Sequence, residues 1–218
     1  MSISLSERKI AIEYASLGFK VFPCHGIIAN VCSCGHNPCK DIGKHPATAH
    51  GYKDGTCDES VIRQWWGDSP WLNIAIAPDK DVVVIDADLK NGGDKTVADW
   101  VAAHGPLPVT PHAKSGGGGD HWYFRLPPGV VVKNRQQVVP GIDTRSFGGY
   151  VLVPPSSHYT AGTYTWVDPL TTPLAPCPDW LLSIVAESPT RATTVTPPMT
   201  PTGDAGGFTM GESAHDFV

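Results

Sequence analysis

The chain has 218 residues, which suits one domain or one domain with an appendage, and its apolar content of 41% is enough for a core. No apolar run is long enough to cross a bilayer, and "MSISLSERKI" lacks the apolar segment of a signal peptide, so we expect a soluble protein of the cytoplasm. The net charge of −5 argues weakly against a nucleic-acid partner. Residues 168–218 carry all of it, whereas residues 111–150 hold five basic side chains against two acidic ones.

The first half of the sequence predicts helices that alternate with short strands. The segment 4–18, "SLSERKIAIEYASLG", places apolar side chains on one helical face and ends in a glycine. "FKVFP" follows as a short strand at 19–23. The further elements predicted here are a helix at 56–66, strands at 73–77 and 82–88, and a helix at 94–105.

From Pro106 onward the pattern predicts β-structure. The expected strands are 109–114, 121–126, 150–154 and 163–167, and a closing helix is expected at 178–188. Proline, threonine and glycine dominate thereafter, which indicates a linker or disordered tail at 188–218 behind a domain at 1–187. The order of elements predicts an α+β fold with a mostly antiparallel sheet and flanking helices.

Residues 24–46 are irregular and rich in cysteine and histidine. Three thiols, those of Cys32, Cys34 and Cys39, fall within eight residues. Without a secretion signal, this crowding favours metal over disulfides, and thiolate with imidazole favours a structural tetrahedral Zn²⁺ site. The fourth ligand stays open between His45, His25 and Cys24, and a histidine is preferred. The alternative is three reduced, unliganded thiols in a loop.

A pair of aspartates closes the buried strand "VVVIDAD". Asp86 and Asp88 are two residues apart, so they project from one face of the strand and would repel each other unless a cation lies between them. Mg²⁺ and Mn²⁺ prefer carboxylate oxygen. The alternative is a strand end that meets solvent, with Asp88 capping the following turn.

A run of four glycines precedes His121 in "AKSGGGGDHWYF". Glycines let successive backbone N–H groups point at one anion, and Lys114 and Ser115 add a charge and a hydroxyl. On the strand that follows, His121 shares a face with Tyr123, which is the aromatic side chain best placed to stack on a base or sugar. The alternative is a hairpin loop with a surface histidine.

A third acidic position follows in "GIDTRSFGGYVLVPPSSH". Asp143 and Arg145 share a strand face, where they can serve as a metal ligand and a phosphate partner, or form a plain surface ion pair. Three aspartates for metal, together with a glycine loop, a histidine and an arginine for phosphates, are what two-metal nucleotidyl transfer needs.

In this order the motifs resemble the bifunctional DNA primase/polymerase (prim-pol) domain of the archaeo-eukaryotic primase superfamily, over about residues 5–187. Such domains occur in phage and plasmid replication proteins, often ahead of a helicase. The resemblance implies an RRM-like catalytic core that uses two Mg²⁺ or Mn²⁺ ions.

The resemblance also implies roles for residues. The metal ligands would be Asp86, Asp88 and Asp143. His121, within Gly119-Asp120-His121, would contact the phosphates of the nucleotide. Further phosphate contacts would come from Lys114, Ser115 and Arg145, and Asn73 would line the nucleotide pocket. An acidic residue, Asp120, is unexpected beside a phosphate site, although strand alternation turns its side chain away from the face of His121.

We therefore expect a DNA primase and polymerase that transfers nucleotides from (d)NTPs to a 3′-hydroxyl on a single-stranded DNA template. The expected setting is phage or plasmid replication in a bacterial host, beside or fused to a helicase. One alternative is a metal-dependent glycosyltransferase, which also uses Asp-x-Asp with Mn²⁺. Another is a non-catalytic zinc module that binds replication DNA.

Overall fold

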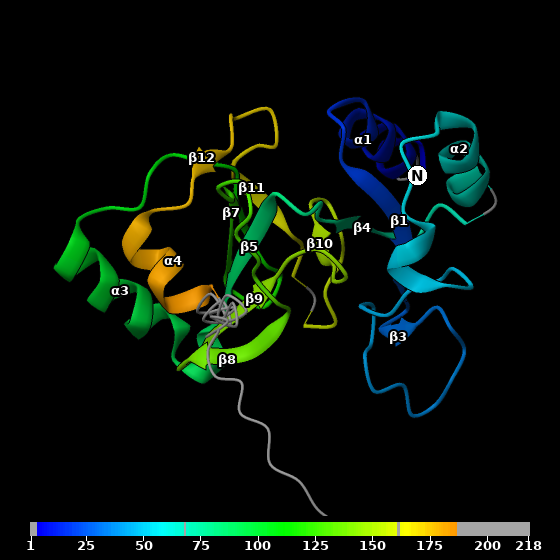
Figure 1. The fold of residues 1–218 in the computed structure, drawn as a ribbon. Helices are drawn as coiled ribbons and strands as arrows, with labels where there is room; N and C mark the ends of the chain where they lie inside the picture. The colour runs from blue at the N-terminus through cyan, green and yellow to red at the C-terminus, as the bar shows by residue number, and fades with distance from the viewer. Residues whose placement is uncertain (1–3, 68, 161, 187–218) are drawn as a thin grey trace, which may run out of the picture. The chain divides into compact units, whose positions relative to one another are not determined.

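A computed structural model describes residues 4–67, 69–160 and 162–186 of the chain (Figure 1). The linker or tail predicted at 188–218 lies outside these residues. None of the helices in the described part combines the length and the apolar character needed to span a membrane.

Two sheets organise the described residues. The larger runs in the order β11-β6-β7-β5-β9-β8, with β12 beside β7, and the smaller runs β1-β4-β10. Pairings between the named strands are antiparallel, except that β12 runs parallel to β7. The strands of the larger sheet are β5 (Val82–Ala87), β6 (His112–Lys114), β7 (Asp120–Arg125), β8 (Arg135–Val139), β9 (Ile142–Arg145), β11 (Thr165–Asp168) and β12 (Ala175–Pro176). Those of the smaller sheet are β1 (Lys20–Cys24), β4 (Asn73–Ala77) and β10 (Val151–Val153).

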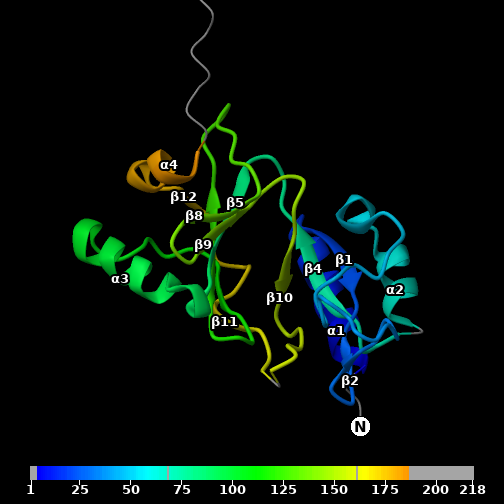
Figure 2. The same cartoon turned by 90° about the horizontal axis from the view of Figure 1, so that it is seen from below.

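Helices accompany each sheet. The longer ones are α1 (Ser4–Ser16), α2 (Glu59–Gly67), α3 (Gly93–His104) and α4 (Asp179–Val185), and single 3₁₀ turns form η1 (Gly51–Asp54) and η2 (Leu89–Asn91). In Figures 1 and 2, α3 and α4 lie beside the larger sheet, whereas α1 and α2 lie beside β1 and β4. These elements confirm the predicted α+β class with mainly antiparallel sheets.

Strand β5 separates two apolar cores because its side chains alternate between the faces of the sheet. Val83 and Ile85 pack on one face with buried residues of α3 and α4. Val84 packs on the other face with residues of α1, α2 and the smaller sheet. Asp86 follows Val84 on this second face, so the carboxylate projects toward the side of the sheet where the smaller sheet lies.

Some elements were not expected from the sequence. Strands 73–77 and 82–88 are adjacent in the chain, yet β4 and β5 belong to different sheets. The cysteine-rich segment contains a short hairpin of β2 (Ile27–Ile28) and β3 (Val31–Cys32), and β8 was not predicted. Its sequence, "RQQVV", lacks the apolar alternation of a half-buried strand, and its pairing with β9 is irregular.

Candidate active site and metal site

Three neighbouring strands bring Asp86, His121 and Asp143 side by side. Asp86 on β5 is paired with His121 on β7 and with Asp143 on β9. Residues directly opposite each other in antiparallel strands project from the same face, with Cβ atoms about 4.5–5.5 Å apart. The His121 Nε2 atom lies 3.3 Å from Asp86 Oδ1. His121, Asp86 and Asp143 therefore form a row across the sheet, with Asp86 in the middle.

This row borders a cavity of about 690 Å³ that residues of both sheets line. Asp86, His121 and Asp143 contribute from the larger sheet, and Val151 and Leu152 contribute from β10. The charged and histidine side chains at its walls are Asp41, Lys44, Asp86, Asp88, Lys90, His121, Asp143, Arg145 and His158. The volume is that of a typical small-molecule or cofactor site.

Opposing influences set the ionisation of Asp86. Burial raises the pKa of this carboxyl group, but the charge and hydrogen bond of His121 and the positive charges of Arg145 and Lys44 outweigh it, so the pKa is lowered overall. Asp86 is therefore a carboxylate near neutral pH, in a partly buried place where a carboxylate favours a nearby cation.

Asp143 is held from two directions. The backbone N–H of Gln137 donates to Oδ1 at 2.8 Å, and the Arg145 guanidinium donates to Oδ2 at 2.9 Å. Arg145 also borders the cavity, so it has a free side toward a ligand while it orients Asp143. The predicted shared face of these two residues agrees with the register of β9 against β5.

Asp88 stands just past the end of β5 and caps η2. Its Oδ1 accepts a hydrogen bond from the Lys90 backbone N–H at 2.9 Å, and its Oδ2 accepts one from the Asn91 side chain at 2.7 Å. Asp88 borders the cavity, but both of its carboxylate oxygens accept hydrogen bonds from residues of the turn. The geometry thus matches the capping alternative for Asp88, whereas Asp86 and Asp143 face each other across the ladder.

The donor set at this row fits a divalent cation in chemistry. Asp86 and Asp143 present carboxylate oxygens to one cavity, and hard ions such as Mg²⁺ and Mn²⁺ prefer these ligands. Each carboxylate is engaged by a protein cation or N–H group, and the three acidic residues are not gathered around one point in the part of the chain described. Asp86 and Asp143 are the residues that would hold such an ion.

The glycine run forms a tight turn beside β5. The Ser115 hydroxyl accepts a hydrogen bond from the Gly119 N–H at 2.9 Å, and Ser115 and Gly119 also border the cavity. A Cβ atom on Gly119 would lie 2.5 Å from the carbonyl oxygen of Ala87, so only glycine permits this close approach. The N–H group of Gly117, which borders the cavity, donates to no group among the described residues, which leaves it available to an anion.

Two residues expected at the nucleotide face lie elsewhere. The Lys114 ammonium is paired with Asp120 at 2.6 Å, and Lys114 is not among the residues that line the cavity. Alternation along β6 and β7 places both on the face opposite His121, where Asp120 also contacts His112 at 2.6 Å. Tyr123 does share the face of His121, but it is fully buried in the core and has no surface on which a base can stack.

Asn73 is a buried bridge and does not line the cavity. Its side-chain N–H groups donate to the Gly43 carbonyl at 2.8 Å and to the Ser157 carbonyl at 2.9 Å. Its Oδ1 accepts from the Ser157 N–H at 2.8 Å. Asn73 was predicted to line the nucleotide pocket. In the structure, its side chain links the cysteine-rich segment to the loop after β10.

His158 is a cavity residue that the sequence did not single out. It is buried, and its Nδ1 accepts from the Thr160 N–H at 3.3 Å and lies 2.8 Å from the Thr160 hydroxyl. Burial lowers the pKa of His158, and the positive charges of Lys44 and Lys90 lower it further, to about 4. His158 is therefore neutral at pH 7 and carries its hydrogen on Nε2, beside the glycine turn. The sequence signal that could have identified His158 is its position at the end of "PPSSH".

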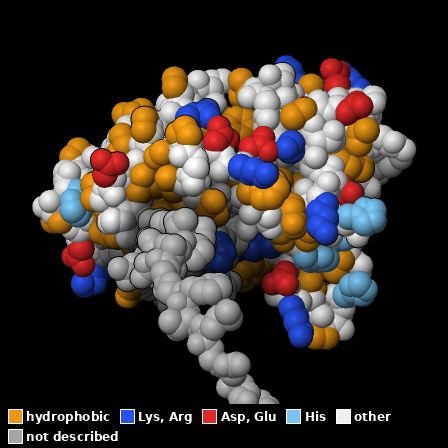
Figure 3. Space-filling model, in the orientation of Figure 1, with side chains coloured by type: hydrophobic (Ala, Val, Ile, Leu, Met, Phe, Trp, Pro, Cys, Tyr) orange, Lys and Arg blue, Asp and Glu red, His pale blue; other side chains and the backbone are white. Residues whose placement is uncertain are grey.

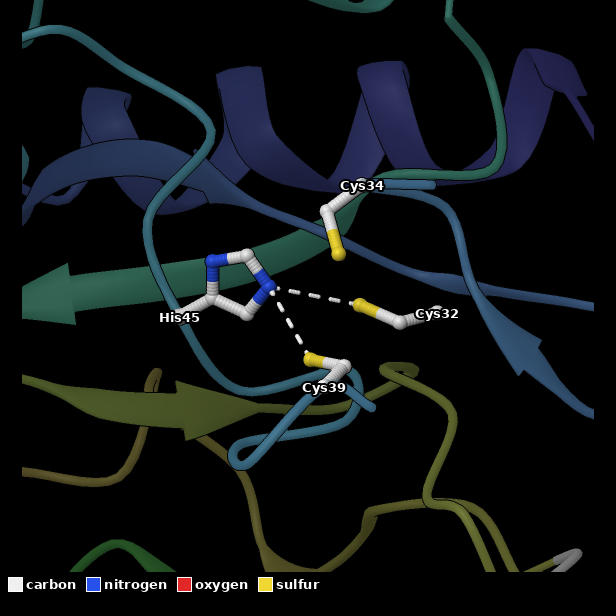
Figure 4. A group of neighbouring side chains, drawn as sticks. All are labelled: Cys32, Cys34, Cys39 and His45. Carbon is white, nitrogen blue, oxygen red and sulfur yellow. Dashed lines mark hydrogen bonds between the residues drawn. The ribbon is translucent and has the colours of Figure 1, made fainter. Parts of the chain in front are cut away.

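The thiols of Cys32, Cys34 and Cys39 converge on the ring of His45 (Figure 4). The ligand atoms of the four residues all lie within 4.8 Å of one another. His45 Nε2 is 3.3 Å from the Cys32 sulfur and 3.5 Å from the Cys39 sulfur. Three thiols and one imidazole are a typical closed ligand set for structural Zn²⁺. In Figure 3, histidine side chains gather on this side of the molecule.

The structure selects among the three residues considered for the fourth position. His45 belongs to the cluster, whereas His25 and Cys24 do not. The ring of His25 is beside that of His45, with centroids 4.5 Å apart, but its Nδ1 contacts the Ser33 hydroxyl at 3.1 Å. Cys24 is fully buried in β1, among the apolar residues of the smaller sheet.

The thiols of the cluster differ in acidity. Burial raises the pKa of Cys32, but hydrogen bonds from the backbone N–H groups of Cys34 and Gly43, and from the side chains of Cys34 and His45, lower it to about 6. The pKa of Cys39 is raised to about 11 by burial and by the neighbouring Cys32 and Cys34. The Cys32 thiolate thus forms easily, and its negative charge disfavours ionisation of the Cys39 thiol. A bound cation removes this repulsion between thiolates.

A comparison with known proteins places the chain in a family. A family model described as "Bifunctional DNA primase/polymerase, N-terminal" matches residues 11–180, which include both sheets and the cysteine–histidine cluster. A search of curated proteins found no match. Enzymes of the matched family are nucleotidyltransferases with DNA primase and polymerase activity. The chain therefore belongs to the bifunctional DNA primase/polymerase (Prim-Pol) family.

Proposed function

We propose that the chain transfers nucleotides from (d)NTPs to the 3′-hydroxyl of a strand paired with a single-stranded DNA template. The support is the alignment of Asp86, His121 and Asp143 across three strands at the wall of one cavity. Family membership supplies the reaction class, and this alignment supplies the residues.

In this proposal Asp86 and Asp143 hold divalent cations. Such ions, when bound, neutralise the triphosphate and lower the pKa of the attacking hydroxyl. His121 Nε2 lies 3.3 Å from Asp86 Oδ1, and Arg145 donates a hydrogen bond to Asp143, so each carboxylate has a neighbour that orients it before a ligand arrives. Fixed charges of this kind need little reorganisation during reaction.

The glycine turn and His158 form the opposite wall of the phosphate site in this proposal. The Gly117 N–H group borders the cavity and is free of partners among the described residues, and the neutral His158 carries a hydrogen on Nε2. A Cβ atom on Gly117 would lie 3.5 Å from that nitrogen, so these donors are close neighbours. Two donors in one place suit the oxygens of a phosphate.

The test is primer extension on single-stranded DNA with Asp86→Asn. Loss of the charge should lower the turnover number at least about 100-fold, since carboxylates that position the ions act directly on the transition-state charge. Asp81→Asn is the matched control, because Asp81 precedes the same strand, pairs with Arg125 at the surface and does not border the cavity. Full extension by Asp86→Asn would refute the proposed roles.

The same assay separates the alternatives. A glycosyltransferase would hydrolyse or transfer from a nucleotide sugar and would not incorporate dNTPs. A non-catalytic zinc module would bind DNA equally well with Asp86→Asn and would extend no primer. Service in phage or plasmid replication and a helicase partner remain predictions from the family resemblance.

A further inference from the structure

Lys44 reaches the nucleotide cavity from the cysteine-rich segment, and it immediately precedes His45 of the metal cluster. We propose that the Cys32–His45 segment is an arm that presents Lys44 to the phosphates of the incoming nucleotide, so that zinc in the cluster and nucleotide in the cavity stabilise each other. This inference rests on the proposed function and adds a residue and a coupling to it.

The backbone around Lys44 is fastened at three successive carbonyl groups. The Gly43 carbonyl accepts from Asn73 at 2.8 Å, and the Lys44 carbonyl accepts from the Tyr150 hydroxyl at 3.1 Å. The His45 carbonyl accepts from the His25 N–H at 2.9 Å. Asn73 and Tyr150 belong to the body of the domain, so these contacts set where the lysine side chain leaves the loop.

The Lys44 ammonium differs from the other cations at the cavity. Lys90 donates to the Tyr159 hydroxyl at 2.8 Å, and Arg145 donates to Asp143. The Lys44 ammonium makes no hydrogen bond or ion pair with any residue that the structure describes, although the backbone of Lys44 does. Its charge nevertheless acts on the cavity, because it contributes to lowering the pKa of Asp86 and of His158. An unpaired ammonium beside a phosphate site gains a strong, charge-assisted hydrogen bond when an anion binds.

Metal in the cluster matters for this lysine because few contacts other than those at the carbonyl groups of residues 43–45 order the arm. Most of residues 33–42 are exposed, and Cys32 is the buried member of the cluster. The ligand atoms of the four cluster residues all lie within 4.8 Å of one another, so a cation bound there would join the two ends of the arm. Without a cation, His45 would lose this connection at the residue next to Lys44. Ordering the arm before nucleotide arrives lowers the entropy cost of binding.

The first experiment measures dATP binding by calorimetry, with Mg²⁺ and the zinc-loaded protein. Lys44→Ala should weaken the affinity on the order of tenfold, which is typical of losing a hydrogen bond to a charged group. Lys40→Ala is the matched control. This substitution removes the same charge from the same loop, and Lys40 does not border the cavity. Lys44→Arg should restore part of the affinity.

The outcomes separate this inference from the proposed function. If wild-type protein binds no dATP, the proposed function itself is refuted. If wild type binds dATP and Lys44→Ala binds it equally well, the function stands and the role of Lys44 is refuted. A loss shared by Lys40→Ala would point to general charge and would also refute that role.

The second experiment tests the coupling, which must be reciprocal at equilibrium. Zinc released from the protein is measured with a chromogenic chelator. Saturating dATP should slow zinc release from the wild type and from Lys40→Ala, and should slow it clearly less in Lys44→Ala. The cluster ligands are intact in all three proteins, so folding is preserved. Protein purified without zinc, or zinc release that ignores dATP in wild type, would overturn the coupling.

Discussion

A buried, neutral histidine, His158, lies among the charged side chains of the cavity. His158 is almost fully buried, with Lys44 and Lys90 close enough to disfavour a second proton. Thr160 occupies its Nδ1, so the remaining Nε2–H is a fixed donor that adds no charge. A donor of this kind binds phosphate oxygen equally at pH 6 and pH 8.

His158 should make the fold less stable in mild acid. Its folded pKa of about 4 is below the unfolded value of about 6.5, so between these values the unfolded chain binds the extra proton. Stability is present above pH 6.5 and is lost as pH falls toward 4, by about 2 kcal/mol at pH 5. Urea unfolding at pH 7 and pH 5 should show this additional loss in wild type but not in His158→Gln. An equal pH dependence of both proteins would contradict it.

At the scale of elements, the first residue of β4 holds two distant loops together. Asn73 binds Gly43 in the cysteine-rich segment and Ser157 after β10, so segments more than a hundred residues apart meet at one side chain. The two loops deliver Lys44 and His158 to the cavity. A buried amide with all these bonds made is a rigid joint between them.

Replacing this amide should loosen both loops at once. Asn73→Leu leaves the Gly43 and Ser157 carbonyls and the Ser157 N–H buried without partners, so we expect a loss of about 2–4 kcal/mol in the free energy of unfolding. Urea denaturation measures it. Asn91→Ala, which removes one exposed turn contact, should cost well under half as much. Comparable losses in the two variants would show that the bridge is unimportant.

At the scale of the whole described domain, the acidic row and the cysteine–histidine cluster are built on different parts of the fold. The acidic row belongs to the larger sheet, and the cysteine–histidine cluster belongs to a segment that follows β1 of the smaller one. The acidic row lines the cavity, and the segment that holds the cluster contributes Asp41 and Lys44 to the same cavity. Loss of zinc is therefore expected to act on stability and on nucleotide binding together.

Removal of the metal should lower the melting temperature. Closing a loop of this size is worth about 3 kcal/mol, which corresponds to roughly 6–12 °C for a domain of this length. Cys39→Ser should lose zinc, measured by elemental mass spectrometry, and melt lower by this amount. Cys57→Ser, at an exposed thiol outside the cluster, should keep both zinc and melting temperature. A zinc-free Cys39→Ser protein with an unchanged melting temperature would exclude a structural role.

Local sequence patterns were sufficient for much of the fold. The long helices and β4, β5 and β7 follow from apolar periodicity, which is a property of neighbouring residues. The separation of β4 and β5 into two sheets could not be predicted, because "PDKD" is compatible with either a hairpin or a crossing. Strand β8 was not predicted because its sequence is polar. Its pairing with β9, which is a tertiary contact, maintains the strand.

The sequence by itself indicated the reaction class through the resemblance of its motifs to a known family. It also placed the acidic and histidine residues on alternating strand positions and the three thiols close together, because period-two alternation and close spacing are local facts. Only the tertiary structure decided that His45 completes the cluster, that Asn73 is a bridge, that Lys114 and Tyr123 lie away from the cavity, and that Lys44 and His158 enter it. These outcomes depend on strand register and on contacts between distant loops, which no local pattern specifies.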